Sequence, residues 1–514
     1  MKDEQIPVIL GVGQCAENPR KPNFIGLSPR ALAINATHAA ISDAGGKAML
    51  SHIDRVTFVR TFGDSVPQSM QRLLAPFGEP TNYAASVAHG IGRPSAETIY
   101  TAAGGDAPSR AVKDALLAIE RGDIAGAVIT GAEALLTQRL LAQQSPTPDW
   151  TEHFPPPDVD EGQGLELMDE PELASAGAWA PIDIYPLLEN AHRAERGMSL
   201  QDYDALMGSL FSRMSAVATT HPQAFSQRAY SATELLETNE DNRLVATPHR
   251  KRFVARDNVN QSAAIVVTSL AVAKQLGRAP RCIHLHGHGE SVDSPVLTRP
   301  TLGQSEALIS AYRDALQASG LHSSDIALFD LYSCFPVAVL AAMQALELDI
   351  DDARDLTVTG GLSFFGGPGN NYSLHAIATM VERLRAAPSA IGLVGANGGH
   401  LTKHAVGIYS AKQPSGPLAQ RVVPRTYLAP RVKIATNSCG SMAIETYTVR
   451  YQGDSVRDII AIGKNSAGER LVAKVDPDDG MIAPRFLAED PVGAVVQVEQ
   501  CQSSQMITQF YENA

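Results

Sequence analysis

Residues 100–135 read YTAAGGDAPSRAVKDALLAIERGDIAGAVITGAEAL, and this stretch sets the plan of the fold. A β-rich run, Thr98–Ala103, leads into a turn at Gly104-Gly105. Apolar residues then recur at helical spacing from Pro108 to Arg121, and a short apolar run follows at Ala127–Thr130. The order of strand, glycine-rich turn, helix and strand predicts a β/α unit.

The same alternation continues in both directions along the chain. Upstream, an apolar run at Val8–Val12 precedes an amphipathic stretch at Ser28–Ala44, and a strand-like segment begins at Val56. From Asn258 the alternation resumes and ends with a predicted helix at Leu374–Arg385 and two further β-rich runs. Two such blocks predict mixed sheets covered by helices, and they suggest duplication of one plan although the letters themselves do not repeat.

Two regions differ from this pattern. Residues 135–256 are loop-rich and helical and include an acidic, proline-containing stretch, so we expect an inserted loop domain with a solvated acidic surface segment. After Pro414, short β-rich runs and no helical stretch predict a small antiparallel barrel or sandwich. The expected domains are an N-terminal half (1–134 and 257–280), the loop domain (135–256), a C-terminal half (281–418) and an added β domain (419–514).

Composition narrows the classes of partner. The 514 residues are 44% hydrophobic and 19% charged, as in ordinary globular proteins, and the length predicts more than one compact unit. The net charge of -13 disfavours nucleic acid and anionic membranes as binding partners, because like charges repel. Five cysteines without C-x-x-C spacing disfavour a disulfide framework or a zinc site. The N-terminal MKDEQIPVIL lacks a signal-peptide pattern and no segment approaches the ~20 apolar residues of a membrane span, so we expect a cytoplasmic protein.

The glycine-rich turn is the first candidate site. Backbone N–H groups near Asp106 and Ala107 lie at the predicted start of a helix, where an anion or a polarised carbonyl is favoured. The alternative is that the glycines only permit a tight turn.

Four segments, in this order, resemble those of thiolases. The turn and helix followed by AGAVITGAEAL resemble the nucleophile-loop region, in which a cysteine begins the helix, and NVNQSAAIVVTS resembles the return from the loop domain. DLYSCFPVAV resembles the His-Asp-Cys-Phe or Asn-Glu-Ala-Phe segment, and TGGLSFFGGPGNNYS resembles the Gly-His-Pro segment. The resemblance covers the first 415 residues and is nearest to the sterol-carrier-type branch. The added β domain makes thiolase-like protein type 1, a group described as including a monomeric state, the best match. It implies an α/β thiolase fold of two duplicated halves with an inserted loop domain.

The departures from the thiolase pattern concern its chemistry. By this resemblance, Gly105 stands at the place of the nucleophilic cysteine and Tyr332 at that of a histidine that polarises the thioester. Gly367, in Gly366-Gly367-Pro368, stands at the place of a second histidine, and the last catalytic cysteine falls near Val394. Because the nucleophile and its helpers act as a unit, we expect no ordinary thiolysis or Claisen condensation.

Several polar residues nevertheless fall near the same predicted centre. Tyr332 could donate a hydrogen bond to a thioester or enolate oxygen, and His400 or His404 could act as a base. The alternatives are that Tyr332 and Cys334 are buried structural residues and that Lys403 is a surface cation. The candidate catalytic residues are Tyr332, His400, Cys334 and Asp106. The candidates for binding the substrate or CoA at this centre are Gly105, Gly366, Gly367, Asn370 and Asn371, and Ser333, Lys403 and His404 are further polar residues near it.

A basic run, His249-Arg250-Lys251-Arg252, lies where the loop domain returns to the core. In thiolases the loop domain contacts the nucleotide of coenzyme A (CoA), whose phosphates require positive charge. The resemblance therefore makes Arg250, Lys251 and Arg252 candidates for CoA binding, and the alternative is a solvated charge run.

Three functions remain open at this point. The first is an acyl-CoA acyltransferase of lipid metabolism that lacks the usual cysteine, and the second is a carbon–carbon lyase, because thiolase-like aldolases also carry the tyrosine and pair with a β domain. The third is a noncatalytic acyl-CoA binder. We expect CoA or acyl-CoA as ligand, no permanently bound cofactor, no metal, and a monomer or dimer.

Overall fold

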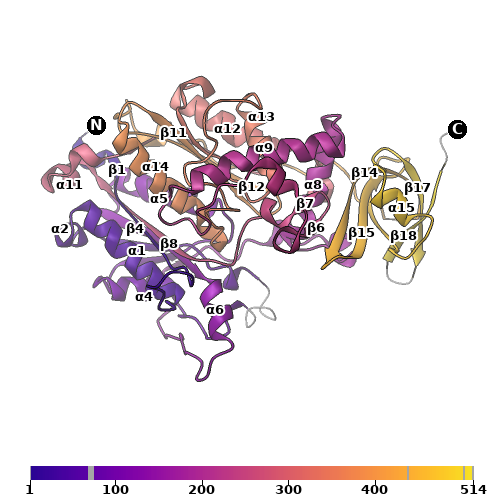
Figure 1. The fold of residues 1–514 in the computed structure, drawn as a ribbon. Helices are drawn as coiled ribbons and strands as arrows, with labels where there is room; N and C mark the ends of the chain where they lie inside the picture. Colours follow the sequence, from indigo (N-terminus) through magenta and orange to yellow (C-terminus); the bar gives the residue numbers. More distant parts are fainter. Residues whose placement is uncertain (1, 67–73, 437–438, 502–503, 512–514) are drawn as a thin grey trace.

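The computed structural model describes residues 2–66, 74–436, 439–501 and 504–511. Two sheets with helices between and outside them form the body, and a third, all-β unit stands at one end of the molecule (Figure 1). Among the described residues, no helix is long and apolar enough to cross a membrane.

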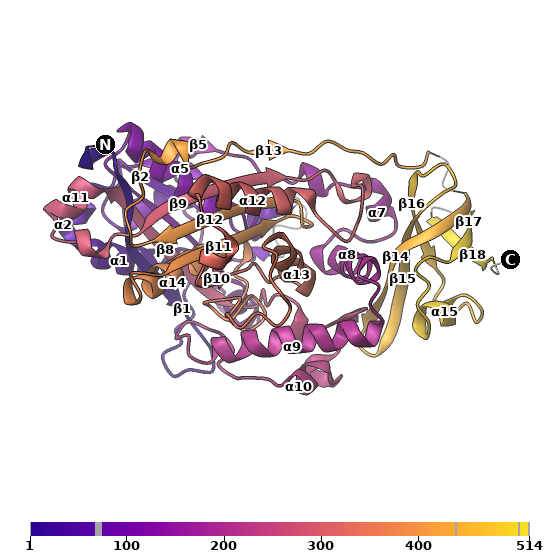
Figure 2. The ribbon, with the colours of Figure 1, turned by 90° about the horizontal axis from the view of Figure 1, so that it is seen from above.

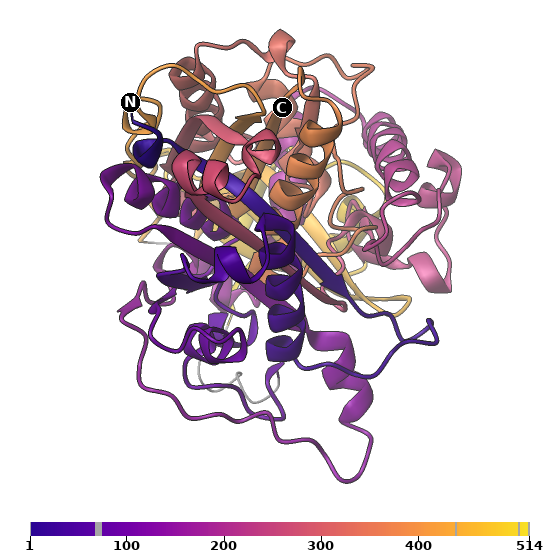
Figure 3. The same cartoon turned by 90° about the vertical axis from the view of Figure 1, so that its left-hand side faces the viewer.

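The first sheet has six strands in the order β1-β8-β4-β2-β3-β5. Helices α1 (Pro29–Ala44) and α4 (Tyr83–Gly90) cover its outer face, and α1 is seen lying across the strands in Figure 3. Helix α5 (Ala107–Arg121) lies on the inner face and also contacts the second sheet. The strands are β1 (Pro7–Ala16), β2 (Arg55–Phe58), β3 (Glu97–Tyr100), β4 (Gly126–Ala134), β5 (Val159–Asp160) and β8 (Asn260–Ser269).

The second sheet has five strands in the order β10-β11-β12-β9-β13. Helix α12 (Glu306–Ser319) packs on β9 and β12, whereas α14 (Tyr372–Ala386) lies between the two sheets beside α5. Helix α13 (Pro336–Ala345) packs against α12. The strands are β9 (His284–Val292), β10 (Leu328–Asp330), β11 (Ile391–Gly398), β12 (Lys403–Ser410) and β13 (Thr426–Tyr427).

The two halves share one close strand–helix contact. A Cβ added at Gly11 of β1 would lie 2.2 Å from the Ala40 carbonyl oxygen of α1, and one at Gly289 of β9 would lie 2.3 Å from the Ala311 carbonyl oxygen of α12. Each strand can therefore approach its helix only because glycine has no side chain. The expectation that no letters repeat is wrong here, since a G-x-G pattern recurs at Gly11 and Gly13 and at Gly287 and Gly289.

The segment between the halves combines helices with long loops. Helix α8 (Pro181–Glu195) is buried along most of its length and contacts both α13 and the all-β unit. The other elements are α6 (Leu135–Leu141), α7 (Pro171–Ser175), α9 (Leu200–Ala218), α10 (Ala232–Leu236), β6 (Leu244–Ala246) and β7 (His249–Arg250).

The all-β unit is a small barrel with its own core, which we call the β domain. Strand β14 pairs with both β15 and β17, while β16 and β18 complete the ring. Strands β6 and β7 extend the same sheet. The elements are β14 (Gly440–Gln452), β15 (Ser455–Lys464), β16 (Arg470–Val475), α15 (Ala483–Leu487), β17 (Val495–Cys501) and β18 (Ser504–Phe510).

Three details of this region differ from the sequence expectation. A helix, α15, is present because Ala483 and Phe486, three residues apart, both face the barrel core. The pairing of β16 with β18 is parallel, so the barrel is not wholly antiparallel. Residues Thr426–Tyr427 form no part of the barrel but pair with β9, within a connection that runs along the body to the β domain (Figure 2).

Candidate functional site

The predicted glycine-rich turn lies where the two halves meet. The Gly104 N–H donates to Oδ1 of Asn370 (2.9 Å), and the Gly105 carbonyl accepts from Oγ of Ser373 (2.5 Å). Gly104 has φ 139°, which favours glycine. The turn that begins α5 in the first half is thus fixed by the start of α14 in the second half.

Gly105 has no room for a side chain. A Cβ at this residue would lie 2.3 Å from the Tyr332 hydroxyl oxygen and 2.5 Å from the Asn397 carbonyl oxygen. Real Cβ atoms do not approach other atoms so closely, so the tyrosine hydroxyl occupies the space that a side chain at residue 105 would need. The two departures from the thiolase pattern, glycine at residue 105 and tyrosine at residue 332, therefore fit each other: the missing side chain leaves the space that the tyrosine hydroxyl fills.

Tyr332 is a buried phenol that stays neutral. It follows β10, keeps 7% of its surface exposed, and packs edge-on against Tyr372 at 5.5 Å between ring centroids. Burial, and then the nearby Cys334 and Asp106, raise the pKa of Tyr332 well above its ordinary value. None of the described residues forms a hydrogen bond with its hydroxyl.

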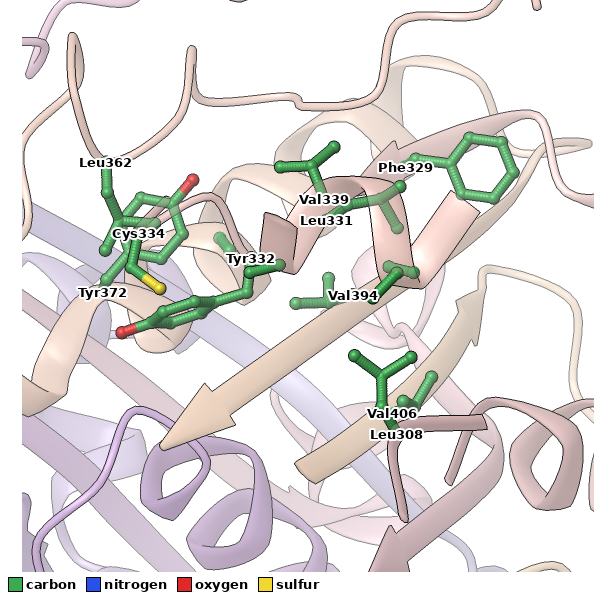
Figure 4. Close-up of a cluster of buried hydrophobic side chains, with 14 of the residues drawn as sticks. Leu308, Phe329, Leu331, Tyr332, Cys334, Val339, Leu362, Tyr372, Val394 and Val406 are labelled. Carbon is green, nitrogen blue, oxygen red and sulfur yellow. The ribbon is translucent and has the colours of Figure 1, made fainter. Parts of the chain in front are cut away.

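Cys334 is drawn next to Tyr332 and Leu362 in Figure 4 and belongs to the same buried cluster. Burial raises the pKa of the Cys334 thiol to about 12, so it is protonated at neutral pH and is no nucleophile. Its sulfur accepts a weak hydrogen bond from Nδ2 of Asn397 (3.6 Å).

Two residues that the sequence interpretation missed complete this centre. Asn397, at the end of β11, is 4% exposed, and its Nδ2 donates to the Tyr185 hydroxyl (2.8 Å). Tyr185 enters from α8 of the loop domain. The asparagine could have been found as a polar residue ending an apolar strand, but no signal marks Tyr185. Val394, taken from the sequence as the nearest position to a lost cysteine, instead lies in the aliphatic core (Figure 4).

Asp106 joins the turn to a group of cations. Its Oδ2 pairs with Arg110 (3.2 Å) and Arg425 (3.3 Å), whereas its buried Oδ1 has no hydrogen-bond partner in the part of the chain that the structure describes. The Lys403 ammonium donates to the Ala103 carbonyl (3.0 Å), and burial lowers its pKa. Lys403 is thus a buried structural donor and not the surface cation of the alternative interpretation.

Both histidines of the GGHLTKH segment are buried and neutral. Burial lowers the pKa of His400 to about 3 and that of His404 to about 4. His404 Nε2 lies 3.2 Å from Ser305 Oγ, while neither ring nitrogen of His400 has a partner among the described residues. Groups with such low pKa values are weak bases at neutral pH.

The asparagine candidates bond the second half to the first. Besides accepting from the turn, Asn370 donates to the Arg60 carbonyl (2.8 Å), and Asn371 donates to the Gly131 carbonyl (2.7 Å). A Cβ at Gly366 would meet Gln261 at 2.4 Å, whereas one at Gly367 would make only ordinary contacts. Ser333 Oγ accepts from the Leu362 N–H (3.0 Å).

The basic run divides into different environments. Arg250 pairs with Asp204 (3.1 Å), and Lys251 is exposed. The Arg252 guanidinium lies over the Tyr230 ring at 4.7 Å. The run connects to the centre through residue 255, whose N–H donates to the Cys334 carbonyl (2.9 Å).

Comparison with protein-family models and with curated proteins gave no match. Two solved structures share the fold at low identity. One is the dimeric peroxisomal thiolase of Saccharomyces cerevisiae (16% identity, TM-score 0.56), and the other is the Ltp2-ChsH2(DUF35) aldolase (17%, TM-score 0.58). Each likeness covers 80% of this chain and 98% of the other. They define the architecture as the thiolase fold.

A third solved structure resembles the whole chain, β domain included. It is the monomeric SCP2-thiolase-like protein type 1 from Mycobacterium smegmatis, with 32% identity and a TM-score of 0.80 over 99% of this chain and 100% of that one. The chain therefore belongs to the SCP2-thiolase-like protein type 1 family of the thiolase superfamily.

Proposed function

We propose that the chain binds an acyl-CoA and that the Tyr332 hydroxyl donates a hydrogen bond to the thioester carbonyl oxygen. One observation carries this proposal: the hydroxyl oxygen lies 2.3 Å from the Cβ position of residue 105, in the space of the side chain that is missing there. A neutral, buried phenol that other described residues leave free is a suitable donor to an oxygen on which charge develops.

The same observation favours a carbon–carbon lyase over an acyltransferase. Without a side chain at Gly105, the acyl group cannot be held there covalently. A retro-aldol cleavage of a 3-hydroxyacyl-CoA needs no such bond. A base removes the hydroxyl proton, the bond between Cα and Cβ breaks to release a carbonyl compound, and its electron pair forms an enolate on the remaining thioester. Tyr332 would stabilise that enolate oxygen before a proton returns to Cα.

The experiment is to incubate the purified protein with 3-ketoacyl-CoAs and 3-hydroxyacyl-CoAs, each with and without free CoA. A lyase releases a shorter acyl-CoA and a carbonyl compound from the 3-hydroxy substrates without free CoA. An acyltransferase instead forms two acyl-CoAs, and only when CoA is added. Binding without any product supports a noncatalytic binder, and no binding overturns the proposal.

We further propose that the CoA nucleotide lies near Arg252 and Lys251, in a protein of net charge -13. Arg252 stacks on Tyr230 and has no ion pair to a described acidic residue, whereas Arg250 is already paired with Asp204. Changing Lys251 and Arg252 to serine should weaken CoA binding and flatten its salt dependence. The matched variant, Arg250→Ser, should change both less, and equal affinity in all three proteins would remove the run from the site.

A further inference from the structure

The hydroxyl of Tyr185 is fully used in holding the backbone of the site. It accepts from Nδ2 of Asn397 (2.8 Å) and from the Leu401 N–H (2.9 Å), and it donates to the Gly399 carbonyl (3.1 Å). Leu401 has φ 54°, which is strained for a residue with a side chain. The Tyr185 hydroxyl therefore stabilises a strained turn directly after the strand that carries Asn397.

Helix α8 places Tyr185 there and is itself held at the start of α13. The Tyr185 ring stacks on Phe335 at 4.3 Å between centroids. One turn further along α8, Oε2 of Glu189 accepts from the Val337 N–H (2.9 Å) at the first turn of α13. Both contacts are made by residues that follow Cys334 closely in the chain, so they couple α8 to the segment that carries Cys334.

The β domain holds α8 at residues between and beside these contacts. Arg450 of β14 pairs with Asp183 (2.7 Å), Asn190 donates to the Tyr447 carbonyl (2.8 Å), and Thr446 donates to the Leu187 carbonyl (2.5 Å). Arg450 is 2% exposed, so its ion pair is shielded from solvent.

A second route reaches the same turn from the other side. Arg470 of β16 donates to the Arg299 carbonyl (2.7 Å), and the Arg299 guanidinium donates to the His400 carbonyl (2.9 Å). The β domain thus contacts two groups that hold residues 399–401, namely α8 and Arg299. Each contact is made by a buried charged side chain.

We propose that Tyr185 is a positioning residue and that the β domain orders the site through α8, so that this domain is a structural part of the site. The role in ligand binding rests on the proposed function, but the coupling itself does not. Disturbing the Asp183–Arg450 pair should loosen Asn397 and Cys334 although neither residue touches the β domain pair directly.

The test uses the full chain and two readouts. The first is the rate at which iodoacetamide alkylates Cys334, followed by peptide mass spectrometry, which separates it from the other cysteines. Tyr185→Phe keeps the ring and removes the hydroxyl, and Asp183→Asn weakens the link between α8 and the β domain. We expect both to raise the rate about fivefold, the factor that corresponds to loss of one hydrogen bond.

Two matched controls remove comparable bonds elsewhere. Tyr83→Phe removes a hydroxyl that donates to Glu79 in the first half, and Asp43→Asn weakens a half-buried ion pair with Arg385 at the far end of α14. We expect a smaller change in alkylation from either control. The coupling would be overturned if Cys334 were alkylated at the same rate in the unaltered protein and in folded Tyr185→Phe and Asp183→Asn.

The second readout is the affinity for acetyl-CoA, measured by calorimetry. The proposal predicts weaker binding in Tyr185→Phe and Asp183→Asn than in the two controls. If the unaltered protein does not bind acetyl-CoA, the proposed function fails while the alkylation result still decides the coupling. If binding is intact in every variant and only alkylation changes, Tyr185 orders the turn but does not position the ligand.

Discussion

The position of the Tyr332 hydroxyl oxygen explains why residues 105 and 332 both differ from the thiolase pattern. A side chain at residue 105 and the hydroxyl of Tyr332 compete for the same space, so one excludes the other. Restoring a cysteine alone should therefore fail. The site is better understood as a different arrangement of donors around a thioester than as a thiolase site with losses.

Gly105→Ala should destabilise the protein because its Cβ collides with Tyr332. Overpacking of a buried site costs about 2 kcal/mol of unfolding free energy. In a Tyr332→Leu background, the same change should cost less because the far end of the ring is gone. Urea denaturation of the four proteins in this double-mutant cycle measures the coupling, and additive effects would contradict the steric explanation.

Tyr332→Phe should lower turnover of the accepted substrate by about a hundredfold, because one donor to a developing oxyanion is removed. Substrate-independent properties, such as the unfolding midpoint, should change little. Tyr409→Phe is a control, since it also removes the hydroxyl of a fully buried tyrosine. Full activity in Tyr332→Phe would remove the hydroxyl from the reaction.

Glu133, at the end of β4, makes stability depend on pH. Burial raises the pKa of Glu133 to about 8, so the folded protein keeps a proton that the unfolded chain releases near pH 4.5. Stability from this group is therefore present at low pH and is lost as pH rises towards about 8. Glu133→Gln should remove this loss and gain stability relative to the unaltered protein at alkaline pH. Denaturation curves at both ends of that range check it, and parallel curves would contradict it.

The strands and helices of the body could be predicted well from local pattern. The helix expected from Pro108 to Arg121 is α5, and the helix expected from Leu374 to Arg385 is α14. The local sequence pattern did not predict the structure correctly where strand pairing or packing depends on residues distant in the chain. Thr426–Tyr427 has the composition of a barrel strand but pairs with β9, and the short α15 packs on the barrel core.

For the same reason, only part of the site could be predicted from the sequence. Gly105, Tyr332 and Cys334 could be located because each follows a recognisable segment. Tyr185 reaches the site through the packing of α8, and the low pKa values of His400 and His404 result from burial that no local pattern encodes.

The shared G-x-G contacts predict equal sensitivity in the two halves. Gly11→Ala and Gly287→Ala would each force a strand away from its helix, because the added Cβ would lie 2.2 and 2.4 Å from a carbonyl oxygen. We expect each to lower the unfolding free energy by about 3 kcal/mol. Gly480→Ala, where nothing lies within 4 Å, is the control. A neutral effect at either strand would argue against the duplicated contact.

Both sheets of the body have one edge covered by the chain itself. Strand β5 pairs with β3, and β13 pairs with β9, so each of these edges ends in a strand of two residues, which offers few backbone groups to another chain. We therefore propose that the protein is a monomer. Light scattering after size exclusion should give the mass of one chain, 54.7 kDa, and a dimer mass would contradict the proposal.

For the molecule as a whole, the central claim is that the Tyr332 hydroxyl donates a hydrogen bond to a thioester carbonyl, in a site without a nucleophile. Isotope-edited infrared spectroscopy of acetyl-CoA labelled with ¹³C at the carbonyl observes this bond directly. The account predicts that the carbonyl band shifts to lower frequency on binding, that the shift is reduced in Tyr332→Phe, and that the affinity is nearly unchanged. A bound thioester with the same band position in both proteins would contradict it.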